Sequence, residues 1–309
     1  MPSLYPDAIV NDVLDRSNIV EVVSSYLPLK RAGRNFKANC PFHPEKTPSF
    51  IVSADKQIYH CFGCGAGGNA LSFVMQYERV GFREALQNLA QRSGVSLPEP
   101  ERTPAQKQHE DLSQSLYGLY EKAAAFYHAL LLTDDEAKEA RSYLQKRGIS
   151  KETAQRFKIG FARNSWDALI QHLKKQSIPL SLIEKSGLAV AKEGGGTYDR
   201  FRNRIIFPIT NLKDRVIGFG ARVTDASLPK YINSPESDIY NKSKVLYGIF
   251  FAKNAIIRQD NCYLVEGYTD VISLHPAGIE NVVSSSGTSL TTDQIKLIKR
   301  FTRNITILY

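Results

Sequence analysis

The first hundred residues alternate between helical and strand-like spacing of apolar side chains. Residues 6–27 place apolar side chains three to four positions apart, which predicts one broken helix or two short ones. Residues 49–54 and 57–62 instead alternate apolar and polar side chains, which predicts a β-hairpin. Asn69 can cap a following helix, and helical spacing returns over 82–92. We therefore expect a small mixed domain here.

The middle of the chain changes from helical to strand-like spacing. Residues from about 108 to 187 are predicted to be helical, with Ser150 capping one of the helices. Trp166 is expected to join the apolar side of another. Residues 204–209 and 215–223 then alternate, which predicts two antiparallel strands.

The last fifty residues alternate strands and helices. Apolar strands are predicted at 262–266, 281–284 and 304–309, and helices at 268–275 and 291–301. This order predicts a parallel, doubly wound sheet.

Three of the four cysteines and one histidine form two C-x2 pairs, separated by seventeen residues. The pairs consist of Cys40, His43, Cys61 and Cys64. This spacing and these residue types predict one closed, structural Zn²⁺ site, with the hairpin between the pairs as in a zinc ribbon. Gly65 permits the positive φ that such turns need. His60 is a competing ligand, but the pairing favours His43.

Four aromatic side chains lie close to the predicted ligands in sequence: Phe42, Phe50, Tyr59 and Phe62. The simplest interpretation makes them the small core around the metal. One or two could instead stack on nucleic-acid bases.

The composition indicates a class of binding partner and a cellular compartment. The chain has 309 residues and a net charge of +9, and residues 198–258 hold 11 basic against 5 acidic side chains. Such a concentrated excess points to a polyanion. Only Cys262 remains outside the metal motif, so no disulfide framework is expected. With neither a signal peptide nor a long apolar stretch, we expect a cytoplasmic protein that does not interact with membranes.

Within the basic segment, Arg200, Arg202 and Arg204 alternate and are expected to project to one side. Further cations recur beside glycine, proline and aromatic residues, which suits phosphate contact and base stacking: Arg222, Lys230 and Lys242. A solvated basic face is the alternative.

Carboxylates follow the first strand of the predicted parallel sheet. Glu266 ends this strand and Asp270 lies one helical turn later, so both can face the crevice at the carboxyl end of the sheet. Converging carboxylates hold Mg²⁺ beside nucleotides. By pattern alone, a solvated strand end is the more usual explanation of such a glutamate.

Residues 264–270, Leu-Val-Glu-Gly-Tyr-Thr-Asp, resemble the first motif of the TOPRIM domain. Together with the Cys/His motif, they make the chain similar to bacterial DnaG-type DNA primases throughout its length. Five further stretches support the resemblance: 200–208, 216–222, 229–235, 242–248 and 286–290.

The resemblance implies a DNA-directed RNA polymerase that makes short RNA primers on single-stranded DNA from ribonucleoside triphosphates. It implies zinc at the four Cys/His ligands and Mg²⁺ or Mn²⁺ at Glu266, with Asp270 close by. It also implies that a groove for template and nucleotide is lined by Arg200, Arg202, Arg222, Lys230 and Lys242. We expect a monomer that meets the replicative helicase through a further C-terminal domain.

The resulting fold class is multidomain α+β. We expect a zinc-ribbon DNA-binding domain at 1–97, a linker at 98–107, a mixed helical and antiparallel basic subdomain at 108–259, and an incomplete doubly wound TOPRIM domain at 260–309. TOPRIM domains place an Asp-x-Asp pair after a strand like 305–309, so the chain is expected to be an inactive N-terminal fragment. Two rivals are a non-catalytic recombination scaffold and a phage-type primase–helicase.

Overall fold

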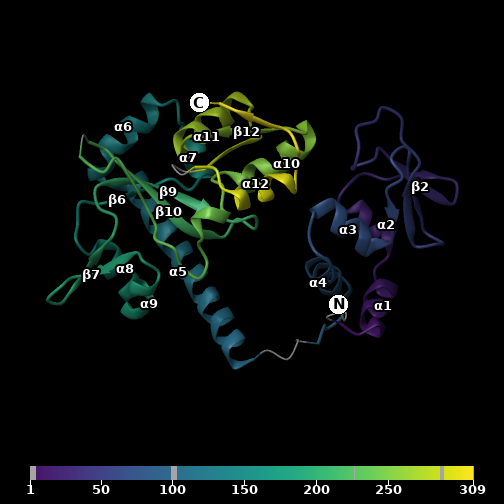
Figure 1. Cartoon of the computed structure of the whole chain (residues 1–309), viewed down its shortest axis with the longest axis horizontal. Coiled ribbons are helices and arrows are strands. Elements are labelled where there is room, and N and C mark those ends of the chain that lie inside the picture. The colour runs from purple at the N-terminus through teal and green to yellow at the C-terminus, as the bar shows by residue number, and fades with distance from the viewer. Residues whose placement is uncertain (1–4, 99–102, 226, 286–288, 309) are drawn as a thin grey trace. The chain divides into compact units, whose positions relative to one another are not determined.

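The computed structural model describes residues 5–98, 103–225, 227–285 and 289–308. The chain divides into two compact units, Met1–Arg102 and Thr103–Tyr309 (Figure 1). Among the described residues, no helix has both the length and the apolar character needed to cross a bilayer.

Unit 1 combines four helices with one antiparallel sheet. Its helices are α1 (Asp7–Arg16), α2 (Ile19–Ser24), α3 (Ala70–Glu78) and α4 (Phe82–Ser93). Its strands, in spatial order, are β1 (Lys30–Ala32), β2 (Asn35–Ala38), β3 (Phe50–Ser53), β4 (Ile58–Cys61) and β5 (Gly67–Gly68). The predicted β3–β4 hairpin is confirmed, whereas the β1–β2 hairpin was not expected from the sequence.

The sheet of unit 1 buries one face against the helices. Phe50 and Val52 of β3 and Tyr59 and Cys61 of β4 are buried, while the side chains between them are more exposed. This alternation places the second cysteine pair at the end of a strand whose inner face is fixed by packing. The predicted cap is confirmed, since the Asn69 side chain accepts a hydrogen bond from the Ser72 N–H at 2.9 Å.

Unit 2 begins with α5 (Pro104–Thr133), which starts inside the segment predicted to be a linker. A capping box at Thr103 and Gln106, with Pro104 in the first turn, explains why this proline-rich stretch is helical. Of the predicted linker, residues 99–102 lie outside the described residues.

Three further groups of elements follow α5. The helices are α6 (Lys138–Lys146), α7 (Lys151–Arg156), α8 (Ala168–Lys175) and α9 (Leu180–Lys185), and a small hairpin joins β7 (Ala189–Ala191) to β8 (Thr197–Asp199). The antiparallel sheet has the order β11 (Tyr231–Asn233), β10 (Val216–Val223), β9 (Arg204–Thr210) and β6 (Gly160–Ala162). The antiparallel pair β9–β10 confirms the prediction, while β6 interrupts the stretch predicted to be helical.

Strand β6 crosses α5 at backbone contact. A Cβ on Gly160 would lie 2.5 Å from the Tyr127 Cβ and 2.7 Å from its carbonyl carbon. The helix and the sheet therefore approach each other as closely as main chains allow at this crossing.

The end of unit 2 is the predicted parallel α/β layer. Its elements are α10 (Ile249–Gln259), β12 (Cys262–Val265), α11 (Tyr268–Leu274), β13 (Val282–Ser284), α12 (Thr292–Lys299) and β14 (Ile305–Ile307), and the strand order is β13-β12-β14. Leu264 and Val283 pack with α10 and α12, whereas Val265 and Val282 pack with α11. Both faces of the sheet are thus covered, which explains its continuous apolar runs.

Two local predictions about unit 2 were wrong. Trp166 precedes α8 and is 60% exposed, because Leu169, Ile170 and Leu173 alone fill the inner side of that helix. Arg200, Arg202 and Arg204 do not share a strand, since β9 begins only at Arg204.

Candidate metal centre and nucleic-acid interface

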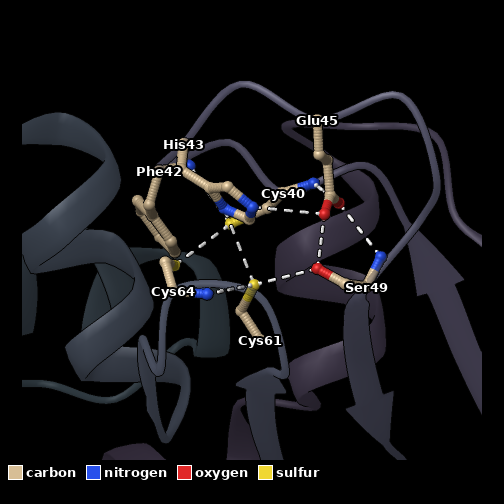
Figure 2. A network of polar contacts seen from close by, with 7 residues as sticks. All are labelled: Cys40, Phe42, His43, Glu45, Ser49, Cys61 and Cys64. Atoms are coloured by element: carbon tan, nitrogen blue, oxygen red, sulfur yellow. Dashed lines mark hydrogen bonds and ion pairs between the residues drawn. The ribbon is translucent and has the colours of Figure 1, made fainter.

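The four predicted zinc ligands converge. One donor atom from each of Cys40, His43, Cys61 and Cys64 lies within 4.8 Å of all the others. The Cys40 and Cys64 sulfurs are 3.8 Å apart, and the Cys61 sulfur lies 3.7 Å from His43 Nδ1 (Figure 2). Three thiolates and one imidazole at this separation suit the closed tetrahedral coordination of Zn²⁺.

A second layer of polar groups fixes these ligands. Glu45 Oε2 lies 3.3 Å from His43 Nε2, so the other ring nitrogen, Nδ1, faces the thiols. The Glu45 carboxylate also accepts hydrogen bonds from the N–H groups of Cys40 at 2.6 Å and Ser49 at 3.0 Å. The Ser49 hydroxyl contacts both the Glu45 carboxylate and the Cys61 sulfur. Glu45 and Ser49 therefore connect the Cys40–His43 pair to the Cys61–Cys64 pair. The sequence analysis did not predict this role.

Two glycines beside the second ligand pair, Gly63 and Gly65, have different structural roles. A Cβ on Gly63 would lie 2.6 Å from His43 Nε2, so only glycine leaves room for the imidazole. Gly65 has φ +76°, as expected for the turn after Cys64.

Burial and local hydrogen bonds shift the pKa values of the cysteine thiols. Burial acts to raise the pKa of the Cys61 thiol, but hydrogen bonds from Ser49 and from the N–H groups of Cys64 and Gly63 outweigh it and lower the pKa to about 6. Burial raises the pKa of the Cys40 thiol, so a cation is needed to stabilise its thiolate.

The aromatic side chains near the ligands divide into two groups. Phe50 and Tyr59 are buried, with ring centroids 5.2 Å apart, and Phe42 packs beside them. Phe62 is 75% exposed and lies against His60, whose side chain is also exposed. The expectation that Phe62 belongs to the metal core was therefore wrong, and His60 lies outside the ligand group.

The basic residues of unit 2 fall into different environments. Arg200 donates to the Gly187 carbonyl at 2.5 Å, and Arg204 donates to the Pro229 carbonyl at 3.0 Å. The Arg202 guanidinium lies 4.3 Å from the centre of the Trp166 ring. Arg202 and Trp166 thus form a surface cluster, while Arg204 is nearly buried.

A second group connects the antiparallel sheet to the parallel layer. Arg222 of β10 pairs with Tyr231 of β11 in the sheet register, and the Tyr231 ring lies 6.2 Å from the ring of Tyr268. The Tyr268 hydroxyl lies 2.7 Å from the Asn233 amide. In the amide orientation that satisfies both neighbours, Asn233 accepts a hydrogen bond from Lys242 Nζ at 3.2 Å. Arg222 and Lys242 are therefore linked through Tyr231 and Asn233 to Tyr268, whose ring is buried, and these side chains together are called the surface around Tyr268. Lys230 is exposed in the loop before β11.

Tyr268 lies between the two predicted acids in the chain, which connects this group of side chains to them in sequence. Glu266 is exposed at the carboxyl end of β12. Asp270 Oδ2 accepts a hydrogen bond from the Gly267 N–H at 3.0 Å, directly beside Glu266. The Cys/His cluster is the only group of three or more metal-ligating residues within the described parts of the chain. Residues 286–288 of the Ser286–Leu290 motif lie outside the described residues.

Tyr143, Tyr268 and Asn233 contact the predicted cations or one another, and the sequence analysis did not single them out. The Arg222 guanidinium lies 3.9 Å from the centre of the Tyr143 ring, although the two are far apart in sequence. A signal for Tyr268 was present, because it sits between the two carboxylates of its motif.

Family models match three consecutive parts of the chain. Residues 5–105 match a CHC2 zinc finger, 126–253 the N-terminal domain of the DNA primase catalytic core, and 263–309 a Toprim-like domain. The crystal structure of the zinc-binding and RNA polymerase domains of Aquifex aeolicus primase is 38% identical, with a TM-score of 0.60, and the match covers 97% of this chain and 72% of that one. The chain belongs to the bacterial DnaG-type DNA primase family.

Other members of this primase family match over the same length. DNA primases of Halalkalibacterium halodurans and Escherichia coli K12 are 46% and 42% identical, over 99% and 100% of this chain and 51% and 53% of theirs. The chain thus spans about half the length of the curated relatives it matches. A DnaG primase catalytic domain solved bound to ssDNA is 41% identical, with a TM-score of 0.59, over 65% of this chain and 64% of that one.

Proposed function

We propose that this chain contains the template-binding and catalytic parts of a primase that joins ribonucleoside triphosphates into short RNA on single-stranded DNA. The observation that carries the proposal is the surface around Tyr268, which connects Arg222 and Lys242 to the strand end at Glu266. A polyanion bound by the cations would lie beside the carboxylates. Positioning of this kind, together with a metal, is the main requirement of nucleotidyl transfer.

In this mechanism Glu266 and Asp270 contribute to an Mg²⁺ or Mn²⁺ site. Glu266 is free to reach solvent at the strand end, while Asp270 is held by the Gly267 N–H. When bound, the metal would activate the primer hydroxyl and neutralise the leaving pyrophosphate. Lys242, Lys230 and Arg222 would bind the phosphates of the nucleotide or template.

Unit 1 would hold the template through the outer face of its sheet. Lys30, Lys37, Ile51 and His60 lie opposite one another across four strands, and Phe62 lies against His60. Cations beside an exposed aromatic ring suit a single strand, with phosphates on the lysines and a base on the ring. The proposed structural zinc at Cys40, His43, Cys61 and Cys64 would keep this face folded.

The Trp166 cluster of unit 2 would provide a second contact to the bound DNA strand. Trp166, Tyr198 and Arg202 lie together at the surface, with the Arg202 guanidinium 5.0 Å from the centre of the Tyr198 ring. Arg200 would support this cluster from the Gly187 carbonyl rather than contact phosphate directly. The replicative helicase is a further proposed partner, and the replication fork in the cytoplasm the proposed place of action.

The test is primer synthesis by the protein carrying Glu266→Gln. We expect synthesis to be lost and binding of a single-stranded template to stay within about twofold, because the carboxylate serves the metal and not the strand. Glu193→Gln, at an exposed position before the β8 strand, is the matched control and should leave synthesis unchanged. Synthesis retained by Glu266→Gln would refute the catalytic assignment.

A further inference from the structure

Asp199, the last residue of β8, is a buried acid next to the Trp166 cluster (Trp166, Tyr198 and Arg202). Asp199 is 2% exposed, whereas Trp166 is 60% exposed. A carboxylate is rarely buried unless other groups bind it. The proposed function gives this carboxylate no role, so its partners were traced.

The Asp199 side chain caps a helix from another part of the chain. Its Oδ2 accepts a hydrogen bond from the Leu169 N–H at 2.7 Å, and its Oδ1 accepts one from the Ile170 N–H at 3.1 Å. Both N–H groups lie in the first turn of α8, where no helical carbonyl can accept them. Asp167, at the N-cap position, makes no capping hydrogen bond with its own side chain. Asp199 therefore supplies the cap and fixes where α8 begins.

The main chain of Asp199 binds the members of the cluster themselves. Its N–H donates to the Trp166 carbonyl oxygen at 2.6 Å, and its carbonyl oxygen accepts a hydrogen bond from Arg202 Nη1. Tyr198 directly precedes Asp199 in β8, so the same strand places its ring. One buried residue thus contacts or adjoins every member of the Trp166 cluster, and its side chain holds the helix that follows Trp166.

The cluster has a geometry that these bonds can set. The rings of Trp166 and Tyr198 have centroids 5.5 Å apart at an angle of 80°. The exposed Lys192 adds a second cation, with Nζ 4.9 Å from the centre of the Trp166 ring. An exposed indole with cations beside it suits a base and its phosphate. Binding is tighter when such a ring is already held in place, because less conformational entropy is then lost.

From these contacts, we propose that Asp199 is a positioning residue that holds the Trp166 cluster ready for single-stranded DNA. It acts through the first turn of α8 and through its main-chain bonds to Trp166 and Arg202. The strand contacts the cluster and not the carboxylate. This inference rests on the strand contact proposed above for the cluster.

The first test is the fluorescence anisotropy of Trp166, the single tryptophan, in the folded 309-residue chain. Asp199→Asn keeps one acceptor oxygen but turns an amide NH₂ toward α8, so the first turn should loosen and the anisotropy should fall. Burial raises the pKa of Asp199 from 3.8 to about 6, against the two N–H bonds, so a pH of about 7.5 keeps the original carboxylate ionised.

Asp167→Asn is the matched control for this measurement. It removes the same charge at an exposed residue directly after Trp166, and it should leave the anisotropy unchanged. An anisotropy in Asp199→Asn equal to that of the original chain would overturn the inference.

The second test is binding of a labelled (dT)12 strand. We expect Trp166→Ala to weaken binding about fivefold or more, as for loss of one stacked base, and Asp199→Asn to weaken it about threefold. Loss of a negative charge alone would strengthen binding of a polyanion, and Asp167→Asn measures that effect. In a Trp166→Ala background, Asp199→Asn should no longer weaken binding, because both substitutions act on one contact.

The outcomes separate the two proposals. Unchanged binding in Trp166→Ala would refute the strand contact, and this inference with it. Weaker binding in Trp166→Ala but not in Asp199→Asn would overturn this inference alone. The same holds if Asp199→Asn weakens binding equally with and without Trp166.

A third measurement needs no substitution, so it remains decisive if Asp199→Asn does not fold. In the original chain, the amide hydrogens of Leu169 and Ile170 should exchange with deuterium at least about tenfold more slowly than that of Ser181. Ser181 lies in the first turn of α9, which has no side-chain cap. Equal exchange rates would show that the carboxylate does not hold α8, and would overturn the inference.

Discussion

The backbone of Gly220 lies against the ring of Tyr268. A Cβ at this position would come within 2.3 Å of the ring, so any side chain must displace the tyrosine. Tyr268 also stacks on Phe207, with ring centroids 5.4 Å apart, so the ring has no room to retreat. The absence of a side chain at Gly220 therefore sets the position of the Tyr268 ring, to which the cations are linked.

Gly220→Ala is therefore expected to destabilise unit 2 by about 1 to 3 kcal/mol through overpacking. The free energy of unfolding, measured by urea titration, tests this. Gly118→Ala is the matched control, because Gly118 is an exposed residue within α5 whose Cβ would meet nothing within 4 Å. The control should be stabilising by about 0.5 to 1 kcal/mol, and equal effects of the two substitutions would contradict the steric argument.

His275 is a buried histidine with no hydrogen-bond partner on either ring nitrogen. Burial, and after it the positive charge of Arg156, lower its pKa from 6.5 to about 4, against the opposing effect of Glu280. The unfolded chain therefore takes up a proton at a higher pH than the folded chain does. Stability from the neutral imidazole is complete above about pH 6.5 and is lost as the pH falls toward 4.

We expect the free energy of unfolding of unit 2 to fall by up to about 3 kcal/mol between pH 7 and 4 because of this histidine. His275→Leu should remove that part of the pH dependence. Fluorescence of Trp166, the single tryptophan, reports unfolding of unit 2 at each pH. His109→Leu alters an exposed histidine instead and should keep the slope of the original chain. A slope unchanged by His275→Leu would show that other groups govern the acid sensitivity.

At the scale of elements, the metal-binding hairpins illustrate what spacing can and cannot predict. Two short C-x2 pairs on either side of alternating residues indicate both ligands and strands, because each constrains the chain locally. The Glu45 carboxylate was not predicted, because the ligand spacing marks only the side chains that bind the metal, and Glu45 acts through Cys40, His43 and Ser49 instead. The Phe62 ring was misplaced for a related reason, since strand period puts it on the outer face while proximity in sequence suggested the core.

Metal removal should unfold unit 1, because ligation supplies a large share of the folding free energy, about 10 kcal/mol or more at comparable small sites. His43→Ala should lose bound zinc and make residues 5–98 sensitive to protease. His60→Ala, which changes the neighbouring exposed histidine, should retain one zinc per chain and resist cleavage. Zinc content measured by mass spectrometry tests both, and zinc loss in His60→Ala would reassign the ligand.

At the scale of the whole chain, the basic excess was predictable and its distribution was not. Composition alone located the excess in 198–258. The structure divides these cations among the Trp166 cluster, the surface around Tyr268 and other parts of unit 2. Alternation of Arg200, Arg202 and Arg204 suggested one shared face, but a strand that begins at Arg204 separates them. Residues distant in sequence, such as Tyr143 and Arg222, meet through tertiary packing that no local pattern encodes.

Single-stranded DNA binding should be steeply salt-dependent. Each phosphate contact contributes about −0.7 to the slope of log affinity against log salt concentration. Lys242→Ala should make the slope shallower by about that amount on any sequence, whereas Lys146→Ala, at an exposed residue of α6, should leave it unchanged. Fluorescence anisotropy over a series of salt concentrations tests this, and identical slopes would exclude a phosphate contact at Lys242.

The crossing of β6 over α5 at Gly160 has a mechanical consequence. Main-chain atoms have no rotamers, so helix and sheet can neither slide nor tilt at this point without breaking the strand ladder. Any rearrangement during a working cycle must then carry both as one piece, with bending confined to loops. Amide hydrogens of Phe161 and of the central turns of α5 should accordingly exchange with deuterium only through unfolding of the entire unit.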